Sequence, residues 1–470
     1  MTTSTLIIPV ENQVRELDAK LLLAGVAAEH GFSIILGSRA FVHYKVASIP
    51  RGVYLAKSMR KLSKRMFSIL RSLGHEIVAW DEEGLVRFAG AEYYRRRLSP
   101  EVMQKISHLI AWGEDNADAL REYPGYHGAP IHITGNPRID LIRPELRGFY
   151  AEDVSQIKQR YGDLVLVNTN FGQVNHYFPR LSEMQAAVAG RGPDADNVFD
   201  VRRGRLKLDI FARFKEMLPA VCRAFPEKKI VLRPHPSENH APWTAIAAEH
   251  SNLHVINEGS VVPWLLAAQA LVANGCTTLV EAAIVGLPQV NYRPLNEPKF
   301  EDPLPQQFGF EANDVHNVIE LLRQILSDEL EATQTPAQQA LLDKNIASLR
   351  GPLAAERIIQ VLVDAAYDRQ QPCAPPLGDR VSGWLQTHTR TVIKKINMRR
   401  PGHRNNMRLH DHRFPPVTAT ELQQRIERLG ALIGRFSRVR VEQTSQHMFR
   451  ISDPSVVGRH SAGRVGRSRV

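Results

Sequence analysis

The chain has 470 residues, a formal net charge of +11 and 43% hydrophobic residues. This length suits two domains with an appendage, and a hydrophobic content near the ordinary globular level argues against wholesale disorder. Three cysteines without a CxxC pair disfavour a disulfide framework and favour a reducing compartment. The first residues lack the pattern of a secretory signal, and no apolar run approaches the roughly 18 residues that span a bilayer. We therefore expect a cytoplasmic protein that at most rests on a membrane surface.

Short apolar strands alternate with helical patterns over residues 1–145. Helices are predicted at 15–30, ended by Gly31, and at 61–73, ended by Gly74. Strands are predicted at 6–10, 32–36, 53–55, 76–80, 108–112 and 131–134. This alternation favours an α/β domain built on a mostly parallel, doubly wound sheet.

A second α/β series occupies residues 160–365, after a polar stretch at 143–159 that we interpret as the link between two domains. Strands are predicted at 164–168, 229–232, 253–256, 270–273 and 289–292. Helices are predicted at 208–225, 278–285 and 315–326. The second series therefore predicts a second domain of the same kind as the first.

The remaining segment, 370–470, begins with a proline-rich stretch, which breaks the pattern. Between Gln386 and Phe414 there are eight lysines or arginines against one acid. Such a run suits an anionic partner, namely phospholipid headgroups, a phosphorylated glycan or nucleic acid, although a solvated basic face explains it equally well. A helix at 419–432, strand-like residues at 439–451 and a disordered tail from Ser455 complete an extension that we expect to be partly disordered.

Polar motifs follow directly after several predicted strands, where parallel sheets bind ligands. In Arg233-Pro234-His235-Pro236, two prolines fix the backbone around His235. A histidine held in this way is able to donate to a phosphate or to protonate one as it leaves. A turn histidine stiffened by prolines is the structural alternative.

The sequence Asn274-Gly275-Cys276-Thr277-Thr278 leads into the helix predicted at 278–285. Gly275 permits a tight turn, and the hydroxyls and free amides at the start of a helix form an anion site. An ordinary threonine N-cap is the alternative. Glu281, one turn further on, is a candidate for hydrogen bonds with a ribose or a base, or a favourable acid in the first turn.

Three consecutive acids, Asp81, Glu82 and Glu83, follow the strand predicted at 76–80. Their mutual repulsion should raise the pKa of at least one, as a general base for an acceptor hydroxyl requires. On spacing alone, a solvated acidic turn closed by Gly84 is the favoured interpretation.

The loop at 168–172 supplies Asn170 and Gly172 as further candidates near a donor phosphate, a surface turn being the alternative. Residues 11–18, Arg39 and Lys57 are weaker candidates for acceptor or anion contacts, and we favour a structural role for each. The histidines are scattered, with no HExxH and no Cys/His ligand spacing, so we predict no metal site. A weak metal-binding tract at His388, His403, His410 and His412 is the one alternative.

Taken together, these motifs resemble those of bacterial surface-carbohydrate enzymes, the GT-B sialyltransferases and Kdo transferases that use CMP-activated sugars. That family carries an acidic-acidic-Gly motif, an HP motif and a downstream hydroxyl pair. The matching residues are Glu82-Glu83-Gly84, His235-Pro236 and Thr277-Thr278, and residues 133–140 resemble the family's GNPR-x-D segment. The hydroxyl pair departs from the family, since several relatives have Ser-Ser.

The resemblance implies a GT-B fold, in which two Rossmann-like domains with parallel sheets face a cleft, with residues 1–145 taking the acceptor and residues 160–365 the donor. One acid of Asp81, Glu82 and Glu83 would be the base. His235 would bind the CMP phosphate and assist its departure, and Thr277 and Thr278 would hold that phosphate.

The function that we expect is therefore that of an inverting, metal-independent glycosyltransferase of capsule or lipopolysaccharide synthesis. It would use a CMP-sugar such as CMP-Kdo as donor substrate, no cofactor, and a glycan or glycolipid acceptor. The residue 57–71 helix, the Arg95-Arg96-Arg97 run and the segment from Arg390 would face the anionic inner membrane. The alternatives are a CDP-glycerol-type polyol-phosphate transferase, a UDP-sugar epimerase-like enzyme and, from a different class, a nucleic-acid-binding protein. The basic segment has few aromatics for stacking, which disfavours the last.

Overall fold

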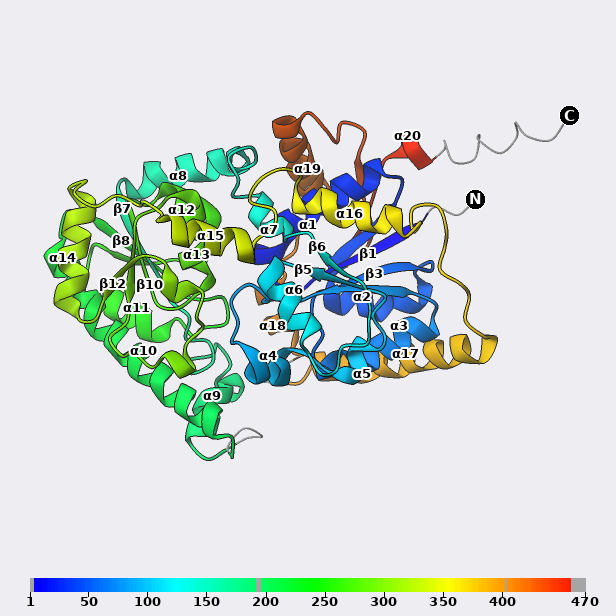
Figure 1. Ribbon diagram of the computed structural model, residues 1–470, viewed down its shortest axis with the longest axis horizontal. Helices are drawn as coiled ribbons and strands as arrows, with labels where there is room; N and C mark the ends of the chain where they lie inside the picture. Colours follow the sequence, from blue (N-terminus) through cyan, green and yellow to red (C-terminus); the bar gives the residue numbers. More distant parts are fainter. Residues whose placement is uncertain (1–3, 192–195, 402, 404, 458–470) are drawn as a thin grey trace, which may run out of the picture. The chain divides into compact units, whose positions relative to one another are not determined.

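The computed structural model describes residues 4–191, 196–401, 403 and 405–457. The chain forms two compact units (Figure 1). Unit 1 contains residues 1–85, 89–149 and 341–470, and unit 2 contains residues 86–88 and 150–340. Each unit is a Rossmann-like α/β unit with a parallel sheet between helices, so the predicted fold class is confirmed.

Unit 1 is built on an eight-stranded sheet in which β1 to β6 run parallel and a C-terminal hairpin extends the edge. The strands, in spatial order, are β13 (Arg440–Ser445), β14 (Met448–Ser452), β2 (Ser33–Ser38), β1 (Thr5–Val10), β3 (Gly52–Ala56), β4 (Glu76–Trp80), β5 (His108–Ala111) and β6 (Ile131–Ile133). β1 and β3 are buried along their whole length, as expected of parallel strands covered on both faces.

The helices of unit 1 come from both ends of the chain. The N-terminal ones are α1 (Gln13–Glu29), α2 (Arg39–Lys45), α3 (Lys64–Ser72), α4 (Gly90–Arg97), α5 (Pro100–Met103), α6 (Glu114–Arg121) and α7 (Pro137–Asp140). The C-terminal ones are α16 (Ala354–Asp364), α17 (Leu377–Met398), α18 (Met407–Arg413), α19 (Ala419–Ile433) and α20 (Pro454–Val457). Asp140 joins the two sets, since it accepts hydrogen bonds from the first amides of α16, Ala354 N at 2.8 Å and Ala355 N at 2.9 Å.

Unit 2 is built on six parallel strands. They are, in spatial order, β12 (Phe310–Ala312), β11 (Gln289–Tyr292), β10 (Ala270–Ala273), β7 (Leu164–Asn168), β8 (Lys229–Arg233) and β9 (Leu253–Val255). The helices are α8 (Ala151–Tyr161), α9 (Glu183–Val188), α10 (Val198–Ala224), α11 (Ala241–Ala247), α12 (Val262–Ala267), α13 (Thr277–Val285) and α14 (Val315–Leu326), and α15 (Pro336–Asn345) leads back to unit 1. The central strands β7 and β10 are fully buried, which is why they appear in the sequence as continuous apolar runs.

Two expectations about domain boundaries need correction. The polar stretch at 143–159 is largely helical, because α8 covers residues 151–161 and belongs to unit 2. Residues 341–365 and the C-terminal segment group with unit 1 instead of forming a donor-domain end and a separate extension. The physical reasons are the packing of α16 on α1 and α7, where Asp140 caps it, and the antiparallel pairing of β14 with the otherwise free edge of β2. Most of the tail predicted from Ser455 lies outside the described residues.

A helix with both the length and the apolar character needed to cross a bilayer is absent from the described part of the chain.

Candidate functional site

His235 lies in the loop after β8, half-buried, with its ring fixed by the next residues of the same loop. The backbone N–H of Ser237 donates to His235 Nδ1 at 3.2 Å, and Ser237 Oγ lies 2.8 Å from the same nitrogen. Because Nδ1 accepts a backbone proton, neutral His235 carries its own proton on Nε2. The loop therefore presents His235 as an Nε2–H donor, the form that a phosphate oxygen requires.

Glu238, three residues after His235, organises this loop. Its side chain is fully buried, and Oε1 accepts hydrogen bonds from His235 N at 3.1 Å, Phe171 N at 2.9 Å and Thr169 Oγ1 at 2.8 Å. Oε2 accepts from Trp243 Nε1 at 3.1 Å. Burial raises the pKa of Glu238, against the effect of these donors. One carboxylate thus joins the loops after β7 and β8.

The loop after β7 places Asn170 and Gly172 at the same edge of the sheet as His235. A Cβ on Gly172 would lie 2.0 Å from Ser237 Oγ, so a larger residue there would displace the Ser237 hydroxyl from its place beside His235. Asn170 is half-buried. Asn168, at the end of β7, is buried, and both polar atoms of its amide lack a hydrogen-bond partner among the described residues.

The loop after β10 turns through Gly275 into α13. Gly275 has φ +48°, and its backbone lies against Gln306, since a Cβ there would be 2.8 Å from Gln306 Nε2. Cys276 is the N-cap and makes no side-chain capping bond, so the threonine N-cap alternative is wrong. The buried Cys276 thiol lies 2.7 Å from Thr278 Oγ1, and burial raises the pKa of that thiol. Thr277 and Thr278, half-buried, form the first turn of α13.

Glu281 is buried in the second turn of α13, so it is not the first-turn acid that the sequence suggested as an alternative.

The loops after β7, β8 and β10 lie at one edge of the unit 2 sheet, because these three strands are adjacent and parallel. His235-Pro236 belongs to the β8 loop and Thr277-Thr278 to the β10 loop, on the two sides of the β7 loop.

Two cations of α10 complete this edge, and sequence analysis missed both. Lys207 is buried and donates from Nζ to Asn274 Oδ1 at 3.3 Å, in the loop that leads to α13. Burial, and then the charge of Arg203, lower the pKa of Lys207. Arg203, one turn earlier, forms an ion pair with Asp302 at 3.0 Å.

A signal for these cations exists in the sequence. Positions 203 and 207 continue the buried stripe of α10 that Ile210, Phe214 and Met217 form at helical spacing. A lysine or arginine in an otherwise apolar stripe is rarely buried without a partner. Their positions therefore predict a polar site at that end of the helix.

The acidic loop after β4 differs from the expected cluster of repelling carboxylates. Asp81 is buried and accepts from Arg97 Nε at 2.9 Å. Glu82 is buried and accepts from Trp80 Nε1 at 2.9 Å, with Lys20 Nζ at 3.9 Å. The first two carboxylates are therefore each held by separate donors.

Glu83 is the most exposed of the three acids and forms an ion pair with Arg15 at 3.0 Å. Burial alone would raise its pKa, but Arg15, Arg138 and Arg97 together lower it to about 2. Glu83 is therefore not the acid whose pKa the expected repulsion would raise, because the sequence did not reveal the arginines that surround it. That one of these three acids acts as a general base stays a prediction.

The side chains after β1, β2 and β3 form a dense ion-pair network. Glu11 pairs with Arg39 at 2.9 Å and with Lys57 at 3.2 Å, and Lys57 also donates to the buried Glu16. Glu16 in turn accepts from Lys20 at 2.6 Å. These partners supply the structural role that the sequence favoured for residues 11–18, Arg39 and Lys57.

Glu11 gives this network a measurable pH dependence. Burial alone would raise its pKa, but Arg39, Lys57 and Arg413 lower it from 4.5 to about 2. A carboxylate with a lowered pKa stabilises the fold above pH 4.5, and this contribution disappears as the pH falls from 4.5 to 2. We expect a loss of at most about 3 kcal/mol in the free energy of unfolding from Glu11 over this range.

Urea unfolding at a series of pH values measures this loss. Glu11→Gln should flatten the decrease, whereas Glu442→Gln, at an exposed position in the same unit, should leave it unchanged. Identical pH profiles for Glu11→Gln and the wild type would contradict the proposed stabilisation.

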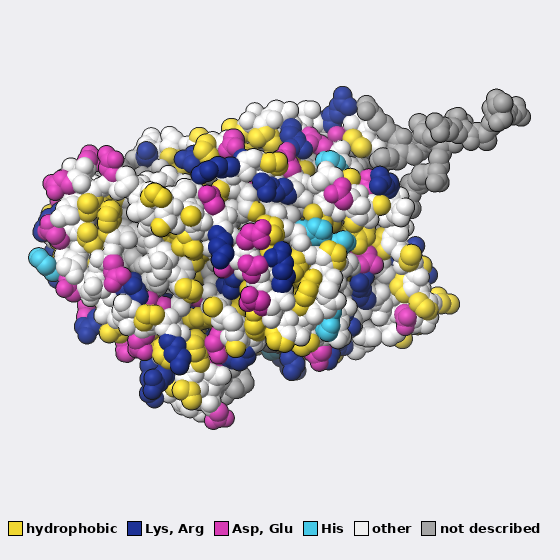
Figure 2. Space-filling view, in the orientation of Figure 1, with side chains coloured by type: hydrophobic (Ala, Val, Ile, Leu, Met, Phe, Trp, Pro, Cys, Tyr) yellow, Lys and Arg dark blue, Asp and Glu magenta, His cyan; other side chains and the backbone are white. Residues whose placement is uncertain are grey.

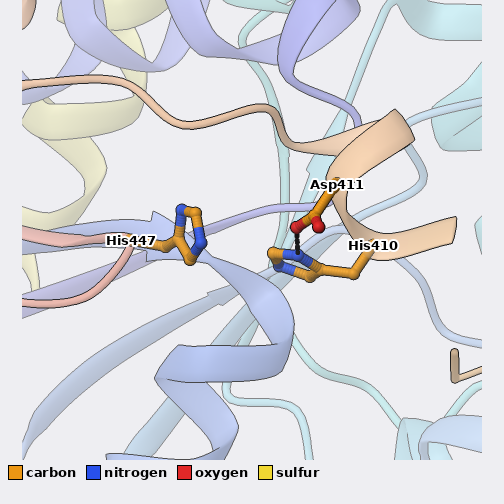
Figure 3. Close-up of side chains that lie close together, drawn as sticks. All are labelled: His410, Asp411 and His447. Carbon is orange, nitrogen blue, oxygen red and sulfur yellow. Dashed lines mark hydrogen bonds and ion pairs between the residues drawn. The ribbon is translucent and has the colours of Figure 1, made fainter. Parts of the chain in front are cut away.

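His410, Asp411 and His447 form the one metal-like cluster found among the described residues (Figure 3). Their ligand atoms lie within 4.8 Å of one another. His410 Nδ1 lies 3.0 Å from Asp411 Oδ1. His410 Nε2 lies 2.8 Å from Ser38 Oγ. Both nitrogens of His410 are thus already engaged, so the arrangement forms a hydrogen-bonded contact between α18 and the end of β2. This cluster also differs from the tract that the sequence left open as an alternative to the absence of a metal site. The two sets share only His410.

No family model and no curated protein sequence matches the chain. Among solved structures, the chain is similar to the wall teichoic acid polymerase TagF, with a TM-score of 0.50 and 10% identity over 78% of this chain and 90% of that one. It is also similar to UDP-GlcNAc 2-epimerase from Neisseria meningitidis, bound to UDP-GlcNAc (TM-score 0.46, 11% identity, 77% and 99% covered). A third similar structure is UDP-GlcNAc 2-epimerase from Methanocaldococcus jannaschii (TM-score 0.44, 14% identity, 77% and 100% covered). The likeness to TagF shows the fold, and the chain has a GT-B type fold.

Proposed function

We propose that the chain is a transferase that binds a nucleotide-linked donor at the carboxyl edge of the unit 2 sheet. The observation that carries this proposal is the hydrogen bond from Ser237 N to His235 Nδ1, because it leaves Nε2 as the nitrogen that bears the proton of a neutral ring. A phosphate at this edge would meet His235 Nε2–H, the start of α13 and the charge of Lys207. Donors of these three kinds recur in phosphate sites.

The reaction that we propose is glycosyl transfer from a CMP-activated sugar with inversion, on the resemblance of the motifs at His235-Pro236 and Thr277-Thr278 to those of CMP-sugar transferases. The bond from the anomeric carbon to the phosphate oxygen breaks as the acceptor oxygen attacks from the opposite face, through an oxocarbenium-like state. Charge then develops on the leaving CMP phosphate, where His235 and the amides of α13 would stabilise it. The proton of the acceptor hydroxyl would go to one of Asp81, Glu82 and Glu83.

Among these acids we favour Glu83, because Asp81 and Glu82 are buried. A pKa of about 2 makes Glu83 a weak base in the free protein. In this proposal Glu83 takes the proton as the acceptor oxygen bonds to the cationic anomeric carbon, because that bond makes the hydroxyl proton strongly acidic.

Polymerases and epimerases are also among the similar structures, so the identity of the donor is the part of this proposal to test first. TagF is a wall teichoic acid polymerase studied with CDPG, and the Neisseria meningitidis epimerase binds UDP-GlcNAc. A CDP-glycerol-type polyol-phosphate transferase and a UDP-sugar epimerase-like enzyme are therefore the competing activities. A thermal-shift series with CMP, CDP and UDP separates them, followed by hydrolysis assays with CMP-Kdo, CMP-sialic acid and CDP-glycerol.

Lys207→Met tests the site itself. We expect the Kd for the preferred nucleotide to rise by at least ~10-fold, since a buried charge-assisted hydrogen bond contributes about 1.5–3 kcal/mol. Stability should be retained, because methionine fills the same space without a buried charge. The matched control is Lys215→Met, at an exposed position two turns further along α10. Equal nucleotide affinity in both variants would exclude Lys207 as a phosphate ligand.

A further inference from the structure

Helix α17 turns its small and polar residues toward the protein. It packs against α2 and α3, and Gly383 and Thr387 are buried in that contact. A Cβ on Gly383 would lie 2.9 Å from the Cβ of Ser72 on α3. Arg390 is half-buried on the same side, and burial lowers its pKa. The inner face of this helix is thus the polar one.

The outer face of α17 is apolar. Eleven large hydrophobic side chains are exposed among the described residues, and seven of them belong to α17. They are Leu377, Val381, Trp384, Leu385, Val392, Ile393 and Ile396. They form one broad stripe about 28 Å long on the outer side of the helix, in which His388 and Thr389 are the exposed polar positions between Leu385 and Val392. Figure 2 shows hydrophobic side chains gathered at the lower right, over the end of α17 that Figure 1 draws there.

Exposed cations border this stripe. Arg380 and Lys395 lie on α17, whose sequence contains a single acid, Asp379. Lys61 and Arg65 are exposed on the segment that includes α3, the helix that α17 packs against. Leu62, between them, is 74% exposed. The surface therefore combines a straight apolar stripe with positive charge along it.

We propose that this face binds the surface of an anionic lipid bilayer, with the stripe at the boundary between headgroups and acyl chains. Aliphatic side chains with an exposed tryptophan suit that boundary, and bordering lysines and arginines match anionic headgroups. The stripe is long and straight, as a helix lying in a membrane plane requires. This proposal does not depend on which donor unit 2 binds.

Only some of the cations expected from the sequence would meet the membrane, namely Lys61 and Arg65 of the residue 57–71 helix and Lys395 of the segment from Arg390. Arg390 faces the protein, and Arg97 and Arg95 form ion pairs with Asp81 and Glu92. Deletion of the C-terminal segment is not a suitable test, because it would also remove β14, which pairs with β2. Substitutions on the outer face of α17 are therefore the suitable test.

The experiment is sedimentation of the full-length protein with phosphatidylcholine vesicles, with and without phosphatidylglycerol. We expect binding that requires phosphatidylglycerol and falls at least ~10-fold in Leu385→Gln/Val392→Gln, because two side chains no longer insert. The matched control is Leu432→Gln, at an exposed position on α19, which should bind like the wild type. The tryptophan emission of the wild type should shift to the blue on binding, and Trp384→Phe should lose most of that shift.

Several results would overturn the proposal. One is a wild-type protein that does not sediment with phosphatidylglycerol vesicles, and another is equal binding by the double variant and the wild type. A third is a double variant that alters only the mass of the protein in solution, which would assign the stripe to contacts between copies. Nucleotide thermal shifts of the double variant should equal those of the wild type, so failure of the donor site and failure of the membrane face are distinguishable.

Discussion

Replacing His235 by alanine should lower kcat/KM for transfer about 100- to 1,000-fold, the usual effect of removing a proton donor to a leaving group. The variant should retain its fold, because the ring is half-buried and the backbone bond from His235 N to Glu238 remains. We expect the free energy of unfolding to change by at most about 1 kcal/mol. Steady-state kinetics with the donor identified by the binding series, together with urea unfolding, measure both effects.

The control for His235→Ala is His316→Ala, at an exposed position on α14 of the same unit, which should leave turnover unchanged. Ser237→Ala removes the hydroxyl that lies 2.8 Å from Nδ1 but keeps the backbone donor. A loss of no more than about 10-fold is expected there, since one of two partners persists. Near-normal transfer by His235→Ala would refute the phosphate role.

Replacing Glu238 by alanine should lower the free energy of unfolding by about 3–5 kcal/mol. The substitution leaves Thr169 Oγ1, Phe171 N, His235 N and Trp243 Nε1 without their common acceptor. A buried donor without a partner costs about 1–3 kcal/mol, and the costs do not add fully because the loops relax together. Nucleotide affinity should also fall, since the loop that holds His235 loses its anchor.

Glu238→Gln separates the charge of this group from its shape. The glutamine retains one acceptor oxygen but turns an NH₂ group toward donors, so a smaller loss of about 1–3 kcal/mol is expected. Glu249→Ala, at an exposed position shortly after α11, is the control and should stay within about 0.5 kcal/mol of the wild type. If Glu238→Ala were as stable as this control, Glu238 would not organise the loops.

The regular part of both units follows from local sequence signals. Continuous apolar runs such as residues 164–167 predict buried parallel strands, and Gly31 and Gly286, both at positive φ, end helices α1 and α13. The loop with His235-Pro236 and the turn at residues 275–278 were predictable as ligand-binding candidates, because each follows directly after one of these strands. Local chemistry was sufficient there.

Long-range partners were not predictable in the same way. The pKa of Glu83 depends on Arg15 and Arg138, which are far from it in the sequence. The sequence favoured a charged surface for the basic segment. In α17, however, the inner side is polar and the outer side is apolar. The cause is that Gly383 and Thr387 allow close packing on α3. Composition alone does not show which face of a helix meets the protein.

The pairing of β14 with β2 has a consequence for the order in which the chain folds during synthesis. Residues 150–340 of unit 2 are contiguous, so this unit has almost all of its contacts available before the last quarter of the chain leaves the ribosome. Unit 1 joins residues near both ends, since Met448 to Ile451 pair with residues of β2 more than 400 positions earlier. Contacts over such separations form slowly and leave a sheet edge open in the meantime. We therefore expect the nascent first unit to be the part of the molecule that depends on chaperones.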